Sequence, residues 1–311
     1  MPPVEPARPE YPARLASHPD SPAGVWQGPL DNDPPPEFSP PIKQETPSGA
    51  RAGMFQKAMF DATWLARTGE GGLGMTDLEL KSVLALPCPT IDWPMLITPG
   101  FAVHYTDGPA NVAMPARLYD AYIQFRWLHR FSPEWATDVS LTPSVFSDFE
   151  QSSSDGFRLT GHAAAAWTWT PATKVVFGVG YFNRLHVKVL PIGGLIWTPD
   201  EDTAFDLLFP QPKLARRIYW TGQTTKEVQD WVYLSAEFGG GTWAIAREGA
   251  EPDLLDITDY RLIVGMERKV AGGLEARVEI GYVFGRRVQY RNGDPEFEPS
   301  DTVLLRGGVK Y

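Results

Sequence analysis

From about residue 53 to the end of the chain, apolar and polar residues alternate with a period of two over long stretches. In "GLEARVEIGYVFG", for example, Val278, Ile280 and Tyr282 alternate with Arg277 and Glu279. Such alternation gives a β-strand one apolar face and one polar face. Several stretches run about 11–15 residues, whereas a usual strand has about 5–6. The chain is therefore predicted to be all-β and built from long amphipathic strands.

The segments between these stretches alternate between two kinds. Some are short, such as "TPATK" and "TPDED", and others are longer and polar, such as "RTGEGGLG" and "RNGDPEFEPSD". This alternation is typical of an up-and-down antiparallel sheet that closes on itself. We expect about 14 strands, with 12 as the alternative count because the stretches near residues 191–220 are short.

The first part of the chain has a different composition. Residues 1–50 contain 14 of the 30 prolines and no apolar periodicity. Such a segment cannot bury enough apolar surface to offset the entropy of ordering. The chain is thus divided into a Pro-rich disordered segment at 1–52 and a β-barrel at 53–311.

Periodicity alone does not show which solvent each face meets. In a soluble barrel or sandwich the apolar face points inward, whereas in a membrane barrel it faces lipid and the polar face lines the lumen. Strand length suits a tilted crossing of the hydrocarbon core, which takes about 9–11 residues. Aromatic residues stand near strand ends, where membrane interfaces favour them; these are Trp64, Trp127, Trp167 and Tyr311. The membrane barrel is the favoured prediction, with a soluble secreted β-sandwich that binds glycans as an alternative.

Composition excludes some classes of partner and cofactor. The net charge of −10 argues against nucleic acid as the main partner. The sequence contains no run of 18 or more apolar residues, so no transmembrane helix is predicted. No apolar signal region is visible near Met1, which leaves open whether Met1 is the natural start. Cys88 is the single cysteine and has no ligand-spaced neighbours, so no metal or cofactor is predicted.

Several stretches, in order along residues 53–311, resemble a known family. They include "GLGMTDLELK", "LITPGFAVHY", "LYDAYIQFRW", "GGLIWTP", "LARRIYW", "AEFGGGTWAI", "DYRLIVGMERKVAGG" and "EIGYVFGRR". The family is a group of bacterial outer-membrane β-barrels filed as domain of unknown function 6268. The resemblance implies a bacterial outer-membrane location, with membrane lipid as a partner, and supplies no activity or catalytic residue.

The last strand, "DTVLLRGGVKY", ends in an aromatic residue. If the sheet closes, this strand pairs with the first one, near Phe55–Ala66, and leaves no free edge. The ending also resembles the C-terminal signature that bacterial outer-membrane barrels present to their assembly machinery. We expect Tyr311 to matter for insertion.

The polar faces supply the candidate functional residues. Residues of both charge signs share the polar phase and are predicted to line the lumen: Asp61, Asp77, Glu79, Asp120, Arg126, Arg158, His162, Arg261, Glu267, Glu275, Arg277, Glu279 and Arg306. Such a lumen either tunes which solutes pass or is plugged by its own salt bridges. His162 has Asp138 and Ser140 as candidate partners for hydrolytic chemistry, but no catalytic signature surrounds it, so a hydrogen-bond network is favoured.

These observations predict a porin-like, non-enzymatic barrel that passes or binds an unknown small solute through a charged lumen. The first alternative is a structural or anchoring barrel without transport, whose proline-rich arm reaches a partner. No catalytic residue is assigned in either case.

Overall fold

The computed structural model describes residues 53–89, 94–109, 112, 114–150, 154–221, 227–247, 252–271, 273–292 and 296–311. Within them lie fourteen strands and a 3-10 turn at Ser154–Gly156, and no helix there is long and apolar enough to cross a membrane. In chain order the strands are β1 (Phe55–Leu65), β2 (Gly74–Pro89), β3 (Pro94–Asp107), β4 (Arg117–Arg130), β5 (Trp135–Ser147), β6 (Phe157–Thr170), β7 (Thr173–Tyr181), β8 (Val189–Asp200), β9 (Thr203–Phe209), β10 (Lys213–Thr221), β11 (Val228–Ile245), β12 (Asp253–Val270), β13 (Glu275–Tyr290) and β14 (Thr302–Lys310). The all-β prediction with about 14 strands is confirmed; the segment at 1–52 lies outside the described residues.

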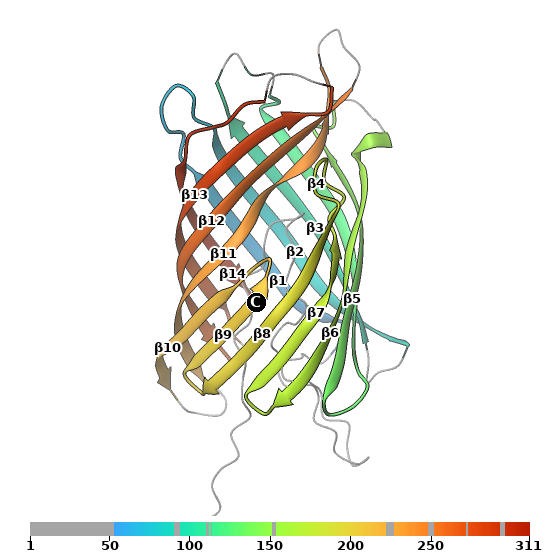
Figure 1. Cartoon of the computed structure of the whole chain (residues 1–311), viewed down its shortest axis with the longest axis vertical. Coiled ribbons are helices and arrows are strands. Elements are labelled where there is room, and N and C mark those ends of the chain that lie inside the picture. Colours follow the sequence, from blue (N-terminus) through green and yellow to red (C-terminus); the bar gives the residue numbers. More distant parts are fainter. Residues whose placement is uncertain are drawn as a thin grey trace, which may run out of the picture.

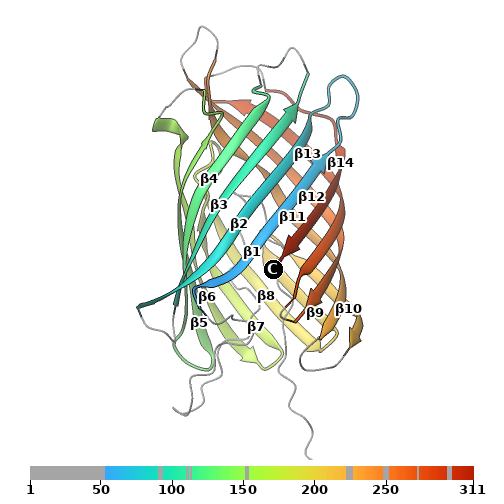
Figure 2. The same cartoon turned by 180° about the vertical axis from the view of Figure 1, so that it is seen from behind.

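The strands form one closed antiparallel barrel in which each pairs with its neighbours in sequence. The sheet closes where β1 pairs with β14, from Met59 opposite Lys310 to Leu65 opposite Leu304. Ala58 and Tyr311 exchange two backbone hydrogen bonds, of 2.8 and 2.9 Å, at the end of this ladder. The predicted pairing of the last strand with the first is confirmed. Figures 1 and 2 show the tilted strands from opposite sides.

The two ends of the barrel differ in their connections. At one end, which we call the turn end, consecutive strands are joined by two to six residues, and β1 begins and β14 ends there. At the other, which we call the loop end, the connections contain three to eleven residues. The predicted alternation of short and long connections is therefore present.

The barrel wall is shorter at β9 and β10, which occupy its lower part in Figure 1. β10 pairs with β11 only as far as Ser235, whereas β11 continues to Ile245. Beyond Ser235, β11 contacts β5 instead: Ala244 is the parallel bridge partner of Ser147, and the Asp148 N–H donates to the Ala244 carbonyl at 3.1 Å. The loop end is thus closed by nine strands, β1–β5 and β11–β14, so the interior narrows toward that end.

The connection between β7 and β8 covers the edge of β11 beyond Ser235, where β10 no longer pairs with it. Arg184 in this connection donates hydrogen bonds to the carbonyls of Gly239 at 2.9 Å and Gly240 at 2.7 Å. Arg158 on β6 holds the same connection by donating to the Asn183 carbonyl at 2.5 Å. Gly240 has a φ of +81°, a left-handed conformation that favours glycine. Burial lowers the pKa of the Arg184 guanidinium from its ordinary value.

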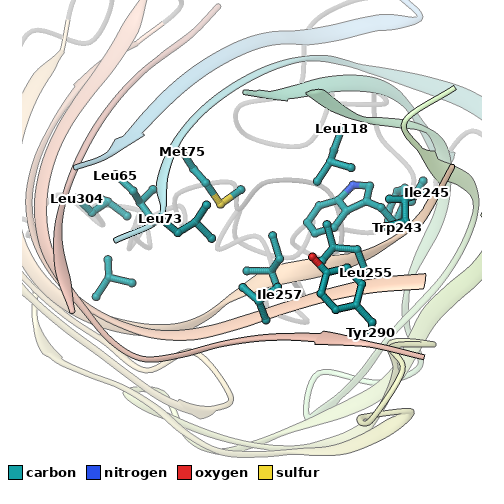
Figure 3. Close-up of a cluster of buried hydrophobic side chains, with 13 residues drawn as sticks. Leu65, Leu73, Met75, Leu118, Trp243, Ile245, Leu255, Ile257, Tyr290 and Leu304 are labelled. Carbon is teal, nitrogen blue, oxygen red and sulfur yellow. The ribbon is translucent and has the colours of Figure 1, made fainter. Parts of the chain in front are cut away.

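A cluster of buried apolar side chains, which we call the apolar core, fills the interior at the loop end (Figure 3). Its members are Leu65, Leu73, Met75, Leu118, Phe146, Trp243, Ile245, Leu255, Ile257, Val283, Val288, Tyr290 and Leu304. All come from the nine strands that close this end or from the residue before β2. Burying each such side chain contributes about 1.5–3 kcal/mol, so the core stabilises the narrowed end. The interior is therefore not uniformly polar, as simple alternation would suggest.

Candidate functional site: the charged interior

The thirteen residues predicted to line the lumen lie on the side of their strands opposite the exposed apolar side chains. Glu275 and Arg277 are partly exposed and the other eleven are buried: Asp61, Asp77, Glu79, Asp120, Arg126, Arg158, His162, Arg261, Glu267, Glu279 and Arg306. Alternation explains the placement, since exposed Val278 and Ile280 flank Glu279 on β13. Their role in handling a solute stays a prediction.

A buried ion-pair network joins β11, β12, β13 and β14. Arg306 contacts Glu237 at 2.6 Å and Glu279 at 2.9 Å. Arg261 contacts Glu237 at 3.3 Å and Asp259 at 2.6 Å. Removing one member of such a network leaves an uncompensated buried charge and costs about 3–5 kcal/mol. The network therefore holds four strands in one register.

Sequence reasoning missed Glu237 and Asp259. The inward-facing positions of β11 also include the aromatic residues Trp231 and Tyr233, which are buried. The sequence of this strand therefore does not show a polar face. The available signal was pairing, because Glu237 stands directly opposite Arg261 on β12. Pairing register is a property of the folded sheet, which a single strand does not reveal.

Some inward side chains cross a neighbouring strand to reach the one beyond it. Tyr233 on β11 crosses β12 and donates a hydrogen bond to Glu279 on β13. Gly265 lies on the crossed strand, and a Cβ there would stand 2.3 Å from the Tyr233 ring. Only glycine leaves room for this crossing.

Two more crossings follow the same arrangement. They are Tyr122 over Gly100 to Glu79, at 2.6 Å, and Arg277 over Gly308 to Asp61, at 2.6 Å. A Cβ on Gly100 would stand 2.2 Å from the Tyr122 ring, and one on Gly308 would stand 2.1 Å from an Asp61 oxygen. These inward glycines allow polar contacts between strands that are not neighbours in the sheet.

His162 lies beside both of the partners considered for it. Its Nδ1 is 2.7 Å from Ser140 Oγ, and its Nε2 is 3.1 Å from an Asp138 oxygen. Arg126 donates to both oxygens of Asp138, at 3.0 and 2.7 Å. Serine, histidine and aspartate in contact form the set used by serine hydrolases. Here the Asp138 carboxylate is already neutralised by Arg126 and all four side chains are buried, which supports the favoured hydrogen-bond network.

A second histidine, His104, belongs to a polar group at the loop end that includes a residue of β11. Its ring nitrogens lie 2.8 Å from Asp77 and 3.0 Å from Asp120. Trp243 on β11 donates its indole N–H to Asp120 on β4 at 2.6 Å. At the loop end β4 and β11 are both neighbours of β5, so this hydrogen bond passes over a single strand. It ties β11 to β4 where β11 meets β5.

The remaining predicted residues lie near the turn end. Glu267 is 3.5 Å from Lys213 and 3.9 Å from Lys269. Glu275 pairs with Lys310 at 2.9 Å. This group joins β10, β12, β13 and β14. The sequence places Lys310 on the polar face, but sequence analysis did not predict Lys213 and Lys269.

The four aromatic residues predicted for the membrane interfaces are exposed on the outer face. Trp64 lies near the loop end, and Trp127, Trp167 and Tyr311 lie near the turn end. Trp167 stacks on Trp135 with 6.3 Å between ring centroids. Aromatic side chains thus stand near both ends of the outer wall, and their role as membrane girdles stays a prediction.

Cys88 is exposed at the end of β2. In the part of the chain that the structure describes, no group of three or more His, Cys, Asp or Glu side chains is arranged to hold a metal ion. That the protein needs no cofactor remains an expectation from the sequence.

Comparison with known proteins places the chain in a family. No curated protein matches the sequence. Among solved structures it is similar to KdgM porin (10% identity, 81% of this chain and 98% of that chain, TM-score 0.35). It is also similar to NanC porin (9% identity, 81% and 98%, TM-score 0.36) and to a mutant of Rh. blastica porin (10% identity, 83% and 99%, TM-score 0.25). Similarity at these scores says nothing about function. The model of the family described as Domain of unknown function (DUF6268) matches residues 93–296, so the chain belongs to this family.

Proposed function

We propose that the protein is a non-enzymatic outer-membrane β-barrel that takes small solutes into a charged interior. The observation that carries this proposal is the inverted polarity of the closed sheet. Charged side chains such as Asp120, Glu279 and Arg306 are buried inside it, whereas large apolar side chains are exposed outside it. In water the same barrel would expose a continuous apolar surface, which soluble monomers avoid.

The outer surface supports a lipid environment. Exposed apolar side chains occur on strands around the whole ring, for example Leu80 on β2 (61% exposed), Phe177 on β7 (50%) and Val278 on β13 (70%). A soluble glycan-binding sandwich would bury one apolar face and keep two separate sheets. A single closed ring with its apolar face outward is what the hydrocarbon core requires, because closure leaves no backbone edge unpaired.

The two ends suggest an orientation. Outer-membrane barrels have short periplasmic turns and longer extracellular loops. We therefore assign the turn end, where β1 begins and β14 ends, to the periplasm and the loop end to the cell exterior. β1 would then begin on the periplasmic side, and the segment at 1–52 precedes it in the sequence.

Passage of a solute requires movement at the loop end. The contacts of Trp243 with Asp120 and of Ala244 with Ser147 hold β11 against β5 and β4 and narrow the interior there. The same contacts favour the second candidate function, a structural or anchoring barrel without transport. The two candidates differ in whether the β11–β12 hairpin opens.

Membrane placement is tested by extraction and gel migration. We expect the protein to need detergent for solubility and to migrate differently when heated, because a closed hydrogen-bonded barrel resists unfolding in cold detergent. Recovery of the unheated protein in the aqueous phase without detergent would overturn the membrane placement.

Passage is tested by single-channel recording in a planar bilayer. The folded full-length chain is expected to give discrete openings interrupted by closures, because the hairpin must move. Absence of conductance above background from a barrel with normal heat-modifiable migration would overturn the pore and leave the anchoring role.

The anchoring role has its own test. If the segment at 1–52 reaches a partner, its deletion should remove that partner from a pull-down while the barrel still folds. An unchanged set of captured proteins would contradict this role.

A further inference from the structure

The burial pattern of β2 changes as the strand approaches the turn end. Over residues 75–81, buried side chains alternate with more exposed ones, as expected for a strand in the barrel wall. Over residues 82–86 every side chain is partly exposed, and residues 87–89 are exposed. The side chains of residues 94–97, at the start of β3, are all partly exposed as well. This part of the hairpin, residues 82–89 and 94–97, which we call the hairpin end, therefore has similar surroundings on both faces.

The hairpin end extends beyond its neighbours in the ring. β1 pairs with β2 only as far as Leu84, and the Ala85 N–H then donates to the Met54 carbonyl at 2.7 Å. β4 pairs with β3 only as far as Met95. Figures 1 and 2 show the blue-green ends of β2 and β3 extending sideways from the wall at the turn end. Among the described residues, 86–89 and 94 thus pair only within the hairpin.

The side chains of the hairpin end are apolar on both faces. Within residues 82–103 of the sequence, Asp92 is the single charged residue. Val83 and Leu96 continue the phase that faces inward in the wall, whereas Leu84 and Ile97 continue the phase that faces outward. A strand that meets water on one face carries polar residues there. Two apolar faces in the same surroundings therefore indicate lipid.

The outward face of the hairpin end is continuous with the outer wall of the barrel. Leu80 and Phe101 are register partners on that wall, and both are exposed. Leu84 and Ile97 are the partners that follow on the same face toward the turn end. Trp127 on β4 stands opposite the next outward residue of β3 and is also exposed. Tryptophan is favoured at membrane surfaces, so the hairpin is expected to leave the wall at that depth.

The backbone of the hairpin end also suits an apolar solvent. In lipid an N–H group without a partner costs free energy, because no water replaces the missing acceptor. Three of the five described residues that lack a partner on β1 or β4 are Pro87, Pro89 and Pro94. Proline has no N–H. The prolines therefore reduce the number of donors that the hairpin carries out of the sheet.

We propose that the hairpin end inserts into the phospholipid leaflet beside the barrel, with acyl chains on both of its faces. It anchors the turn end in that leaflet, next to the place where β1 begins. The inference rests on the proposed membrane placement and adds to it a lipid-binding element outside the ring.

The test uses Cys88, which lies in the hairpin end, is exposed and is the single cysteine of the chain. An environment-sensitive fluorophore (NBD) is attached there, and the full chain is folded into phosphatidylcholine–phosphatidylglycerol vesicles. Lipids that carry a spin label on the acyl chain quench a fluorophore in the leaflet, whereas iodide on both sides of the membrane quenches one in water. We expect strong quenching at Cys88 by the spin-labelled lipids and little quenching by iodide.

Two other labelled positions, each in a Cys88→Ala background, provide the controls. The label on Val278→Cys, on the lipid-facing wall, should be quenched by the spin-labelled lipids. The label on Lys188→Cys, in an exposed loop-end connection, should be quenched by iodide alone.

A charged variant tests the contact with lipid directly. With the label on Cys88, Leu86→Asp should raise quenching by iodide by about twofold or more, because an ionised carboxylate is costly in lipid and draws the hairpin end into water. Leu86→Met is the matched control and should leave the quenching unchanged. Heat-modifiable migration checks that each variant folds.

Three outcomes overturn the inference. Quenching of Cys88 by iodide to the level of Lys188→Cys would place the hairpin end in water. Protection of Cys88 from both quenchers would mean that a protein surface, such as a second copy of this chain, covers it. Equal quenching by iodide in Leu86→Asp and Leu86→Met would show that Leu86 does not lie in lipid.

The Val278→Cys control separates failure of this inference from failure of the proposed function. If its label is quenched by the spin-labelled lipids in any of the three cases, the membrane placement stands and only the hairpin anchor is lost. Absence of lipid quenching at Val278→Cys as well would contradict the membrane placement itself.

Discussion

Single inward glycines decide which charged residues meet inside the barrel. A side chain at Gly265, Gly100 or Gly308 would occupy the space through which Tyr233, Tyr122 or Arg277 crosses the strand. The crossing places a hydroxyl or guanidinium against a carboxylate two strands away. Such contacts join strands two apart in the sheet, which backbone hydrogen bonds between adjacent strands do not link.

Gly265→Ala should destabilise the barrel by about 1–3 kcal/mol, because the new methyl group displaces the Tyr233 ring and breaks its bond to Glu279. Denaturant unfolding of the reconstituted protein measures the change. Gly193→Ala is the matched control, since the nearest atom to a Cβ there is 3.8 Å away. Equal stability of the two variants would show that the crossing contributes nothing.

A second prediction at the residue scale concerns Ser140. We expect it not to react with a fluorophosphonate probe, although it touches His162. The hydroxyl is buried and accepts the His162 backbone N–H, and Arg126 already neutralises Asp138. If the probe labels the wild-type protein and Ser140→Ala abolishes the labelling, the prediction of a non-enzymatic barrel is wrong and this cluster is a catalytic site.

At the scale of elements, β11 has two roles along its 18 residues. Its first half pairs with β10 and completes the fourteen-stranded wall. Its second half passes Gly240, receives hydrogen bonds from Arg184 and meets β5. The consecutive apolar run Trp243–Ile245 then fills the narrowed end, because both faces of this part of the strand are covered.

The closure by β11 can be locked with a disulfide. Ser147→Cys with Ala244→Cys, in a Cys88→Ala background, should crosslink on oxidation because the two residues are bridge partners. If passage needs this contact to open, oxidation should lower the conductance and a reductant should restore it.

Val139→Cys with Ala163→Cys, which are partners on the outer face of β5 and β6, is the control pair. It should crosslink without changing the conductance. Failure of the Ser147–Ala244 pair to crosslink would contradict the contact between β11 and β5. A crosslink with unchanged conductance would show that solutes do not pass through the loop end.

At the scale of the whole molecule, stability depends on closing the ring. The β1–β14 seam joins the two ends of the barrel sequence, so its formation requires every intervening strand to be in place. Tyr311 contributes the last two backbone hydrogen bonds of that seam and an exposed aromatic ring.

Deletion of Tyr311 should lower the yield of folded barrel in vesicles. Each lost backbone hydrogen bond costs about 1 kcal/mol, and the interfacial ring is lost as well. Tyr311→Ala retains the backbone bonds and should give an intermediate yield, while Phe60→Ala controls for loss of an aromatic from the middle of the same seam. The heat-modifiable fraction on a gel reports the yield, and a wild-type yield after deletion would contradict this role.

The sequence predicted the all-β class, the strand number and the pairing of the last strand with the first. The phase of residues such as Glu279 and Arg306 also agreed with their burial. Each of these inferences depends on the period of two in apolar and polar residues. That period is set within each strand and can be recognised without knowing which strands pair. The sequence analysis did not predict Glu237, Asp259, Lys213 or Lys269 as site residues, because their significance depends on which strand stands opposite.

The alternation in the sequence by itself determined that this chain forms long strands with one charged and one apolar face. Only the tertiary structure decided which charges meet, where glycines let side chains cross, and that β11 leaves β10 for β5. Strand alternation is set by backbone geometry within a few residues. Contacts such as Trp243 with Asp120 join residues 123 apart in sequence and depend on the register and closure of the whole sheet.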